Sequence, residues 1–194
     1  MDKTNELLCK GFFYSLEQNF YMSIQYFNRA IASNEHDYRG HFYRANDFLN
    51  MKINENSKRE YLLILQKFSD QLSPCMKLVI EGCIHRCDNH VDLAIDSYKK
   101  GYTIDNQNFF AIYFLAYCYS CKSMLDEALQ LFIESLSLVE QTFSNCNVFA
   151  HIAYVSRLNK NHCCRFTTRR RNWMMQKHII EKVCNHIQEV WLPL

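Results

Sequence analysis

Cysteine and histidine side chains are the groups in this 194-residue chain most able to do chemistry, and the chain carries ten cysteines and eight histidines. Cys118 and Cys121 have the C-x-x-C spacing of dithiol redox sites. The run from Cys83 to His90 holds two cysteines, two histidines and an aspartate, a composition that zinc sites use. A third set of potential ligands lies near the C-terminus, at His162, Cys163, Cys164, His178, Cys184 and His186.

None of these three sets fits the chemistry that its spacing suggests. Dithiol redox sites belong to a strand–helix context, whereas Cys118 and Cys121 fall within a helical pattern. On a helix Cys83 and Cys87 share a face, but His85 points away, since residues two apart do not meet. The C-terminal set matches no established zinc spacing. The chain also lacks a Gly-rich phosphate loop, a serine elbow and a His-Glu-x-x-His motif. The sequence therefore predicts no catalytic residue, no cofactor and no metal site.

The overall composition indicates a helical protein without a strong charge field. Lys and Arg number 22 and Asp and Glu 20, so the formal net charge of +2 disfavours nucleic acid or a membrane surface as partner. With 48% apolar residues the chain can bury a core, while four Gly and two Pro disfavour a turn-rich sheet protein. No secretory signal is visible at the N-terminus, and no apolar run is long enough to cross a membrane. We therefore expect reduced, structural cysteines and a cytoplasmic protein, with Arg169–Arg171 leaving nuclear import open.

Four copies of one pattern of small and aromatic residues run along the chain. Small residues recur at Gly11, Ala45, Gly82 and Ala116, which are 34, 37 and 34 residues apart. A second small residue and then an aromatic one follow in each copy, at Ser23 and Phe27, Ser57 and Tyr61, Ala94 and Tyr98, and Ala128 and Phe132. The small residues let two helices cross closely, and the rings fill the space between successive helix pairs. Because one pair cannot bury both of its faces, the pairs must stack.

This pattern resembles the tetratricopeptide repeat (TPR) family, whose unit is an antiparallel helix pair of about 34 residues. The resemblance implies an all-α fold in which stacked antiparallel helix pairs form a right-handed TPR-type superhelix. It places four pairs within residues 4–141, at about 4–37, 38–74, 75–108 and 109–141. A weak fifth first helix follows at 142–160, and a basic linker with an amphipathic, capping C-terminal helix at 161–194. The family's terminal proline is absent from all four copies, and helical-hairpin repeats that read RNA are the main alternative.

By the same resemblance, the first helices line a concave groove that holds a partner. The candidate binding residues implied in this way are Leu8, Phe12, Arg39, Phe42, Asn46, Val79, Arg86, Phe110, Tyr113 and Tyr117. Most of them are apolar, which is typical of a surface that takes an amphipathic helix or an extended apolar segment. Arg39 and Arg86 are the candidate polar anchors. The places of the family's clamp for chaperone C-terminal carboxylates hold Leu8, Phe12, Tyr43, Met76 and Ile80, none of which can bind a carboxylate.

We therefore expect a non-catalytic TPR adaptor or scaffold that binds an apolar or helical peptide of a partner protein and needs no cofactor. The alternative is a subunit or fragment of a larger TPR scaffold that stacks end to end and self-associates. An RNA-binding repeat protein is the weaker alternative, because it would need a basic concave surface and the implied groove is apolar. A chaperone tail and a membrane are not expected as partners.

Overall fold

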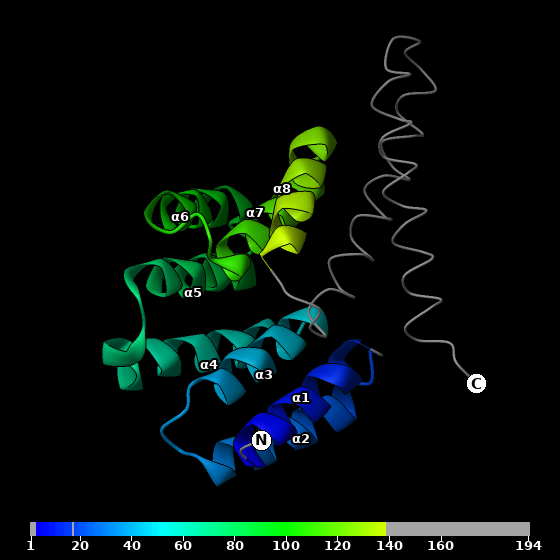
Figure 1. Cartoon of the computed structure of the whole chain (residues 1–194), viewed down its shortest axis with the longest axis vertical. Helices are drawn as coiled ribbons and strands as arrows, with labels where there is room; N and C mark the ends of the chain where they lie inside the picture. The colour runs from blue at the N-terminus through cyan, green and yellow to red at the C-terminus, as the bar shows by residue number, and fades with distance from the viewer. Residues whose placement is uncertain (1–2, 17, 139–194) are drawn as a thin grey trace, which may run out of the picture.

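The regular structure of this chain is helical throughout the part that the computed structural model describes, residues 3–16 and 18–138 (Figure 1). Its α-helices are α1 (Lys3–Leu16), α2 (Phe20–Ser33), α3 (Arg39–Asn50), α4 (Asn54–Lys67), α5 (Pro74–Cys87), α6 (Val91–Ile104), α7 (Phe109–Cys121) and α8 (Leu125–Ser137). A short 3-10 helix, η1 (Ser69–Gln71), lies between α4 and α5. The segments predicted at 142–160 and 161–194 lie outside the described residues.

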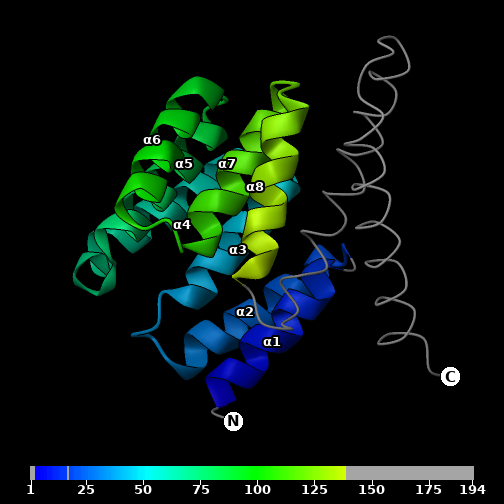
Figure 2. The same cartoon turned by 45° about the horizontal axis from the view of Figure 1, so that its top comes forward.

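Consecutive helices form pairs that stack along the chain. α1 packs on α2, α3 on α4, α5 on α6 and α7 on α8, and each second helix also packs on the first helix of the next pair. Figure 2 shows this succession from the blue pair α1–α2 to the yellow-green α8. The predicted all-α architecture of stacked helix pairs is confirmed. Within the described residues, no helix has the length and apolar character needed to cross a membrane.

Each pair reverses direction in the same kind of backbone turn. The turn residues are Gln18, Lys52, Asn89 and Ser123, with φ values of 58°, 62°, 59° and 61°. The N–H of the following residue bonds the carbonyl five residues back, as His90 does to His85 at 2.8 Å. This left-handed ending is the Schellman motif, which satisfies the last carbonyls of the first helix. The turns follow the spacing of the small residues, so the repeat is present in the backbone as well as in the side chains.

The two helices of a pair cross where the sequence places small residues. A Cβ atom added to Gly82 of α5 would come within 2.4 Å of the ring of Tyr98 of α6. Gly11 of α1 is equally close to the ring of Phe27 of α2, at 2.5 Å. The four rings of the pattern are fully buried: Phe27, Tyr61, Tyr98 and Phe132. The close helix crossing predicted from the repeat is therefore confirmed at both glycines.

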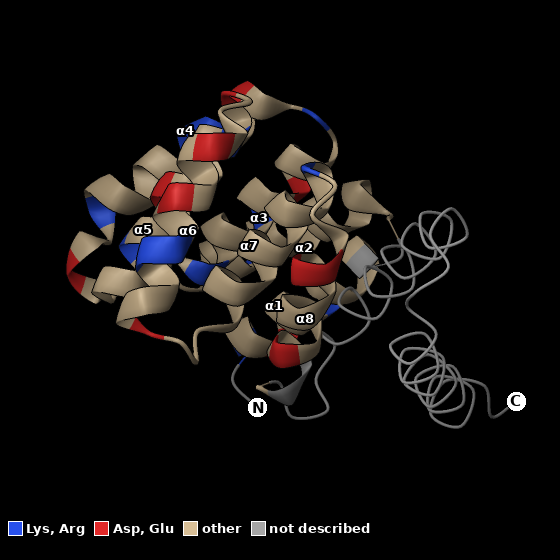
Figure 3. Cartoon of the chain, turned by 90° about the horizontal axis from the view of Figure 1, so that it is seen from above, with Lys and Arg blue, Asp and Glu red and all other residues tan. Residues whose placement is uncertain are grey.

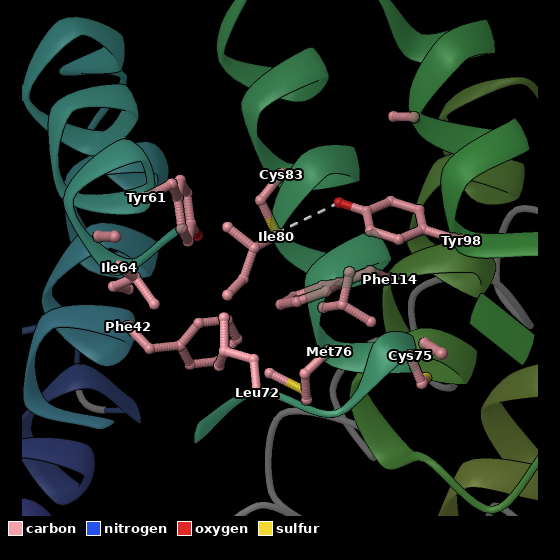
Figure 4. Packing of buried hydrophobic residues seen from close by; sticks show 14 of the residues in the cluster. Phe42, Tyr61, Ile64, Leu72, Cys75, Met76, Ile80, Cys83, Tyr98 and Phe114 are labelled. Atoms are coloured by element: carbon pink, nitrogen blue, oxygen red, sulfur yellow. Dashed lines mark hydrogen bonds between the residues drawn. The ribbon is translucent and has the colours of Figure 1, made fainter. Parts of the chain in front are cut away.

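The largest core cluster joins the second, third and fourth pairs around α5. Phe42 of α3 and Tyr98 of α6 approach Ile80 and Cys83 of α5 from opposite sides, and Phe114 of α7 lies between them (Figure 4). The hydroxyl of Tyr98 donates a hydrogen bond to the sulfur of Cys83 at 3.4 Å. α5 is thus covered by its neighbours, which is why its inner residues are apolar.

One buried carboxyl group ties the first two pairs together. Asp47 of α3 is 1% exposed, and it accepts hydrogen bonds from the hydroxyl of Ser15 of α1 at 2.5 Å and from the hydroxyl of Ser23 of α2. Burial raises the pKa of Asp47 to about 6, although the two hydrogen bonds act in the opposite direction. The sequence pattern gave no sign of this link, because polar residues outside the repeat pattern look like surface residues.

The close helix crossing can be tested by comparing two glycine-to-alanine substitutions, one at a crowded position and one at a position with room for a methyl group. Gly82→Ala should lower the free energy of unfolding by about 1–3 kcal/mol, because the new methyl group overlaps the buried ring of Tyr98. Gly101→Ala in α6 should raise it by up to about 1 kcal/mol, since its nearest neighbour would be the Cys75 carbonyl oxygen at 3.6 Å and alanine favours the helix. Urea unfolding followed by circular dichroism measures both. Equal stability of the two variants would contradict the crossing geometry.

The Asp47 carboxyl predicts a pH dependence of stability. Its pKa is about 6 in the folded chain and about 4 in the unfolded one, so the folded state holds the proton more tightly. Stability from this group is therefore present below about pH 4 and is lost as the pH rises through about 6. Asp47→Asn should remove this dependence and raise the free energy of unfolding at pH 7 by about 1–3 kcal/mol. The test is the difference between variant and parent in urea unfolding at pH 5 and pH 7; a constant difference would contradict the prediction.

Candidate functional site

The first helices of the four pairs come together on one side of the array, which we call the inner face. α1 contacts α3, α5 contacts α7, and aromatic side chains join α3 to α7. α7 contributes no charged residue to this face, as its ribbon in Figure 3 shows. The inner face is therefore built mainly from apolar and aromatic side chains.

Three of the predicted binding residues lie in the core. Leu8 of α1, Phe42 of α3 and Val79 of α5 are 6%, 2% and 0% exposed. Val79 lies in the central cluster with Phe42, whereas Leu8 packs in a smaller cluster with Phe27. These three side chains support the inner face from beneath and offer a partner almost no surface.

Aromatic side chains of the second and fourth pairs meet across α5. The ring centroids of Phe42 and Phe110 are 4.9 Å apart in an edge-to-face contact, and Tyr43 lies 6.4 Å from Phe110. Met76 of α5 is buried beside this contact. Where these rings meet, the chain's own side chains fill the inner face. The sequence analysis missed this contact, although the density of aromatic residues on α7 was a signal for it.

Three further predicted residues already have partners within the chain. Arg39 pairs with Asp37, with 2.6 Å between guanidinium nitrogen and carboxylate oxygen. Phe12 packs edge-on against Tyr43 with ring centroids 5.8 Å apart. The amide of Asn46 donates to the carbonyl of Phe42 and accepts from the hydroxyl of Tyr61, each at 2.9 Å.

The remaining four predicted residues lie together on α5 and α7, and we call them the α5–α7 patch: Arg86, Phe110, Tyr113 and Tyr117. All four are partly buried. The guanidinium carbon of Arg86 lies 4.4 Å from the ring centroid of Tyr117 and 5.4 Å from that of Phe114, which is cation–π geometry. Tyr113 stacks on Phe109 with centroids 5.4 Å apart. The structure thus brings these four residues together: Arg86 lies over Tyr117 and interacts electrostatically with Tyr113, and Phe110 and Tyr113 both contact Phe109.

Arg86 carries a charge that no described residue neutralises. None of the ion pairs and hydrogen bonds in the described part of the chain involves its guanidinium group. The groups that interact with it electrostatically are phenols and thiols, chiefly Tyr98, Cys83 and Cys118. Burial raises the pKa of Tyr98 and of Cys83, and raises the pKa of Cys118 to about 12, so all three are neutral near pH 7.

The cysteines and histidines that opened the sequence analysis do not assemble into a site in the described residues. Cys83, Cys87 and Cys118 are buried free thiols, and Cys121 is an exposed one. No group of three or more His, Cys, Asp or Glu side chains in the described part of the chain is arranged to hold a metal ion. The candidate ligands from His162 to His186 lie outside the described residues.

A hollow of about 550 Å³ lies beside the patch, at the turns of the third and fourth pairs. It is lined by Asn89, His90, Val91, Asp92, Leu93, Cys121 and Lys122. Lys122 and Asp92 pair across it at 2.6 Å. Cys121 also neighbours Tyr117, so the hollow and the α5–α7 patch adjoin. The sequence analysis did not identify this hollow, because turns that are far apart in the chain form it.

Comparison with known proteins defines the class of fold. No family model and no curated protein matches the chain. A crystal structure of MamA protein matches it with a TM-score of 0.51 at 11% identity, covering 98% of this chain and 97% of that one. MamA 41-end from Desulfovibrio magneticus RS-1 gives a TM-score of 0.50 at 10% identity, over 99% of both chains. YrrB, a TPR protein with an unusual peptide-binding site, gives 0.43 at 12% identity over 95% of this chain and 91% of that one, too low to bear on the site.

The stacked helix pairs and the likeness to the two MamA structures show an all-α fold of the TPR type. At about 10% identity they show the fold alone, so any inference about a site must rest on the residues of this chain.

Thiol labelling tests the assignment of the C-x-x-C pair as structural. In the native chain, iodoacetamide should label Cys121 readily and Cys118 more than about 100-fold more slowly. The reason is that Cys118 is buried, and a pKa of about 12 leaves few of its thiols ionised near pH 8. Peptide-resolved mass spectrometry measures both rates, and denaturant should make them similar. Equal rates in the native chain, or ready formation of a Cys118–Cys121 disulfide, would contradict the assignment.

Proposed function

We propose that this chain is a non-catalytic protein-interaction module that binds an apolar or helical segment of a partner protein at the α5–α7 patch. The observation that carries the proposal is the gathering of three aromatic side chains and one arginine on two adjacent first helices. The TPR-type fold supports it, since arrays of stacked helix pairs present extended inner surfaces to partners.

The patch has the composition of a binding hot spot. Tyrosine and arginine are among the side chains that dominate interface energies, and they do so in partly buried, well-packed surroundings. The ring of Tyr113 is held by stacking on Phe109 and by an edge contact with Phe132. Arg86 is held over Tyr117. Because these side chains are already ordered by their neighbours, a partner would lose little affinity to ordering them.

The partner should be apolar where it meets α7. The sequence of this helix is FFAIYFLAYCYSC, which offers rings and aliphatic groups and no charge. An amphipathic helix or an extended apolar segment buries its own apolar face against such a surface. A polar or strongly charged segment would lose its hydration there without gaining partners.

Peptide display gives a direct test with a matched control. Peptides enriched from a random display library on the full chain should bind Tyr117→Ala about tenfold or more weakly, because a patch ring is lost. Tyr21→Ala should bind them as the parent does, since Tyr21 lies on α2 and is 72% exposed. Fluorescence anisotropy measures the affinities, and sedimentation shows whether a second copy of the chain is the partner instead. A library that yields no binder, or binders equally strong on both variants, would contradict the proposed function.

A further inference from the structure

We propose that Arg86 makes the α5–α7 patch a receptor for a carboxylate, namely a glutamate or aspartate side chain set within the apolar segment of the partner. This inference rests on the proposed function and specifies what the partner must carry. Arg86 is not among the residues at the places of the TPR clamp for C-terminal carboxylates, so the inference does not depend on that clamp.

The first ground is that the donors of Arg86 are unused. A guanidinium group has five N–H donors in one plane and accepts no hydrogen bond. In the described part of the chain those donors meet no carboxylate, carbonyl or hydroxyl acceptor within hydrogen-bond distance. The guanidinium carbon of Arg86 lies over the rings of Tyr117 and Phe114, and these rings supply no oxygen or nitrogen acceptor to its N–H groups. Among the described residues, the N–H donors that pair with carboxylates therefore meet no acceptor of that kind.

The second ground is the contrast with the other arginines on and near the first helices. Arg39 is paired with Asp37, and Arg44 is paired with Glu60 at 2.7 Å. Arg29 also lies over a tyrosine ring, that of Tyr26 at 5.4 Å, but it is exposed to water. Arg86 differs from all three, because it is partly buried and forms no ion pair with a described residue.

The third ground is the surroundings of the charge. Its phenol and thiol neighbours are neutral near pH 7, so they leave the positive charge uncompensated. An unpaired charge in partly buried surroundings lowers stability, and an incoming anion that pairs with it recovers that loss. The charge of Arg86 therefore favours binding of a partner that places one negative group beside it.

A carboxylate fits this place better than a phosphate does. Arg86 is the one cation of the α5–α7 patch, and α7 itself has no Lys or Arg. Of the lysines near α7, Lys99 lies over Tyr119 and Lys122 pairs with Asp92. Nucleic-acid and phosphate sites instead gather several positive charges. The planar fork of one guanidinium group matches one carboxylate in a bidentate pair. The adjoining rings of Tyr113 and Phe110 suit the apolar residues that flank it.

The test uses phenylacetate, its neutral isostere phenylacetamide, and inorganic phosphate as probes of the full chain. In nitrogen–proton NMR spectra, phenylacetate should shift the Arg86 Nε–Hε signal saturably, with phenylacetamide and phosphate about tenfold or more weaker. In Arg86→Met, which lacks this signal, the backbone amide signals of α5 and α7 should show no preference for carboxylate over amide, and Tm should rise because an unpaired charge is removed. Arg29→Met is the matched control and should keep the preference. Equal responses to phenylacetate and phenylacetamide, or to phenylacetate and phosphate, would overturn the inference.

Peptides separate the failure of this inference from the failure of the proposed function. Peptides enriched on the full chain should contain a Glu or Asp whose replacement by Gln or Asn weakens binding about tenfold or more to the parent and not to Arg86→Met. Enriched peptides that lack an acidic residue, and that Tyr117→Ala weakens but Arg86→Met does not, would overturn the carboxylate inference and leave the binding function standing.

Discussion

The contact of an aromatic ring with a small residue is the interaction on which the rest of this array depends. The ring of the second helix fills the space that a glycine or alanine of the first helix leaves, as Tyr98 does over Gly82. This contact determines how closely the two helices of a pair approach. The same ring then reaches the next pair, since Tyr98 lies 5.7 Å from Phe114 of α7. One side chain therefore couples the crossing within a pair to the stacking between pairs.

The sequence was sufficient to predict the helix pairs because the information for them is local and repeated. The small residues and rings recur at fixed offsets, and each meets a neighbour within its own pair. The contact of Phe42 with Phe110 could not be predicted in this way, because it joins the second and fourth pairs. Whether such rings meet depends on small rotations summed over successive pairs, and a periodic pattern does not record that sum. Phe42 was accordingly expected in an open groove, and it lies in the core.

For the two arginines predicted as anchors, the neighbouring sequence held further information about which one pairs with an acid within the chain. Arg39 and Arg86 both lie on first helices, Arg39 at the start of α3 and Arg86 near the end of α5, yet only Arg39 has an aspartate two residues before it. That aspartate lies in the connection before α3 and accepts hydrogen bonds from the guanidinium group through both of its oxygens. Arg86 is followed two residues later by Asp88, but this carboxylate pairs with Lys58 of α4 at 2.7 Å. Side-chain pairing between helices thus decides which arginine keeps its donors for a partner.

Asp47 and Arg86 are both withdrawn from water without an opposite charge beside them, and their chemistry leads to different outcomes. The carboxyl group of Asp47 accepts two serine hydroxyls, and with a pKa of about 6 it can take up a proton when the surroundings favour the neutral form. A guanidinium group cannot lose its charge in the accessible pH range. Among the described residues Arg86 has aromatic rings beside it and no anion. The charge of Asp47 can therefore be removed by protonation within the fold, whereas the charge of Arg86 persists, and this difference is the physical basis of the carboxylate proposed as its ligand.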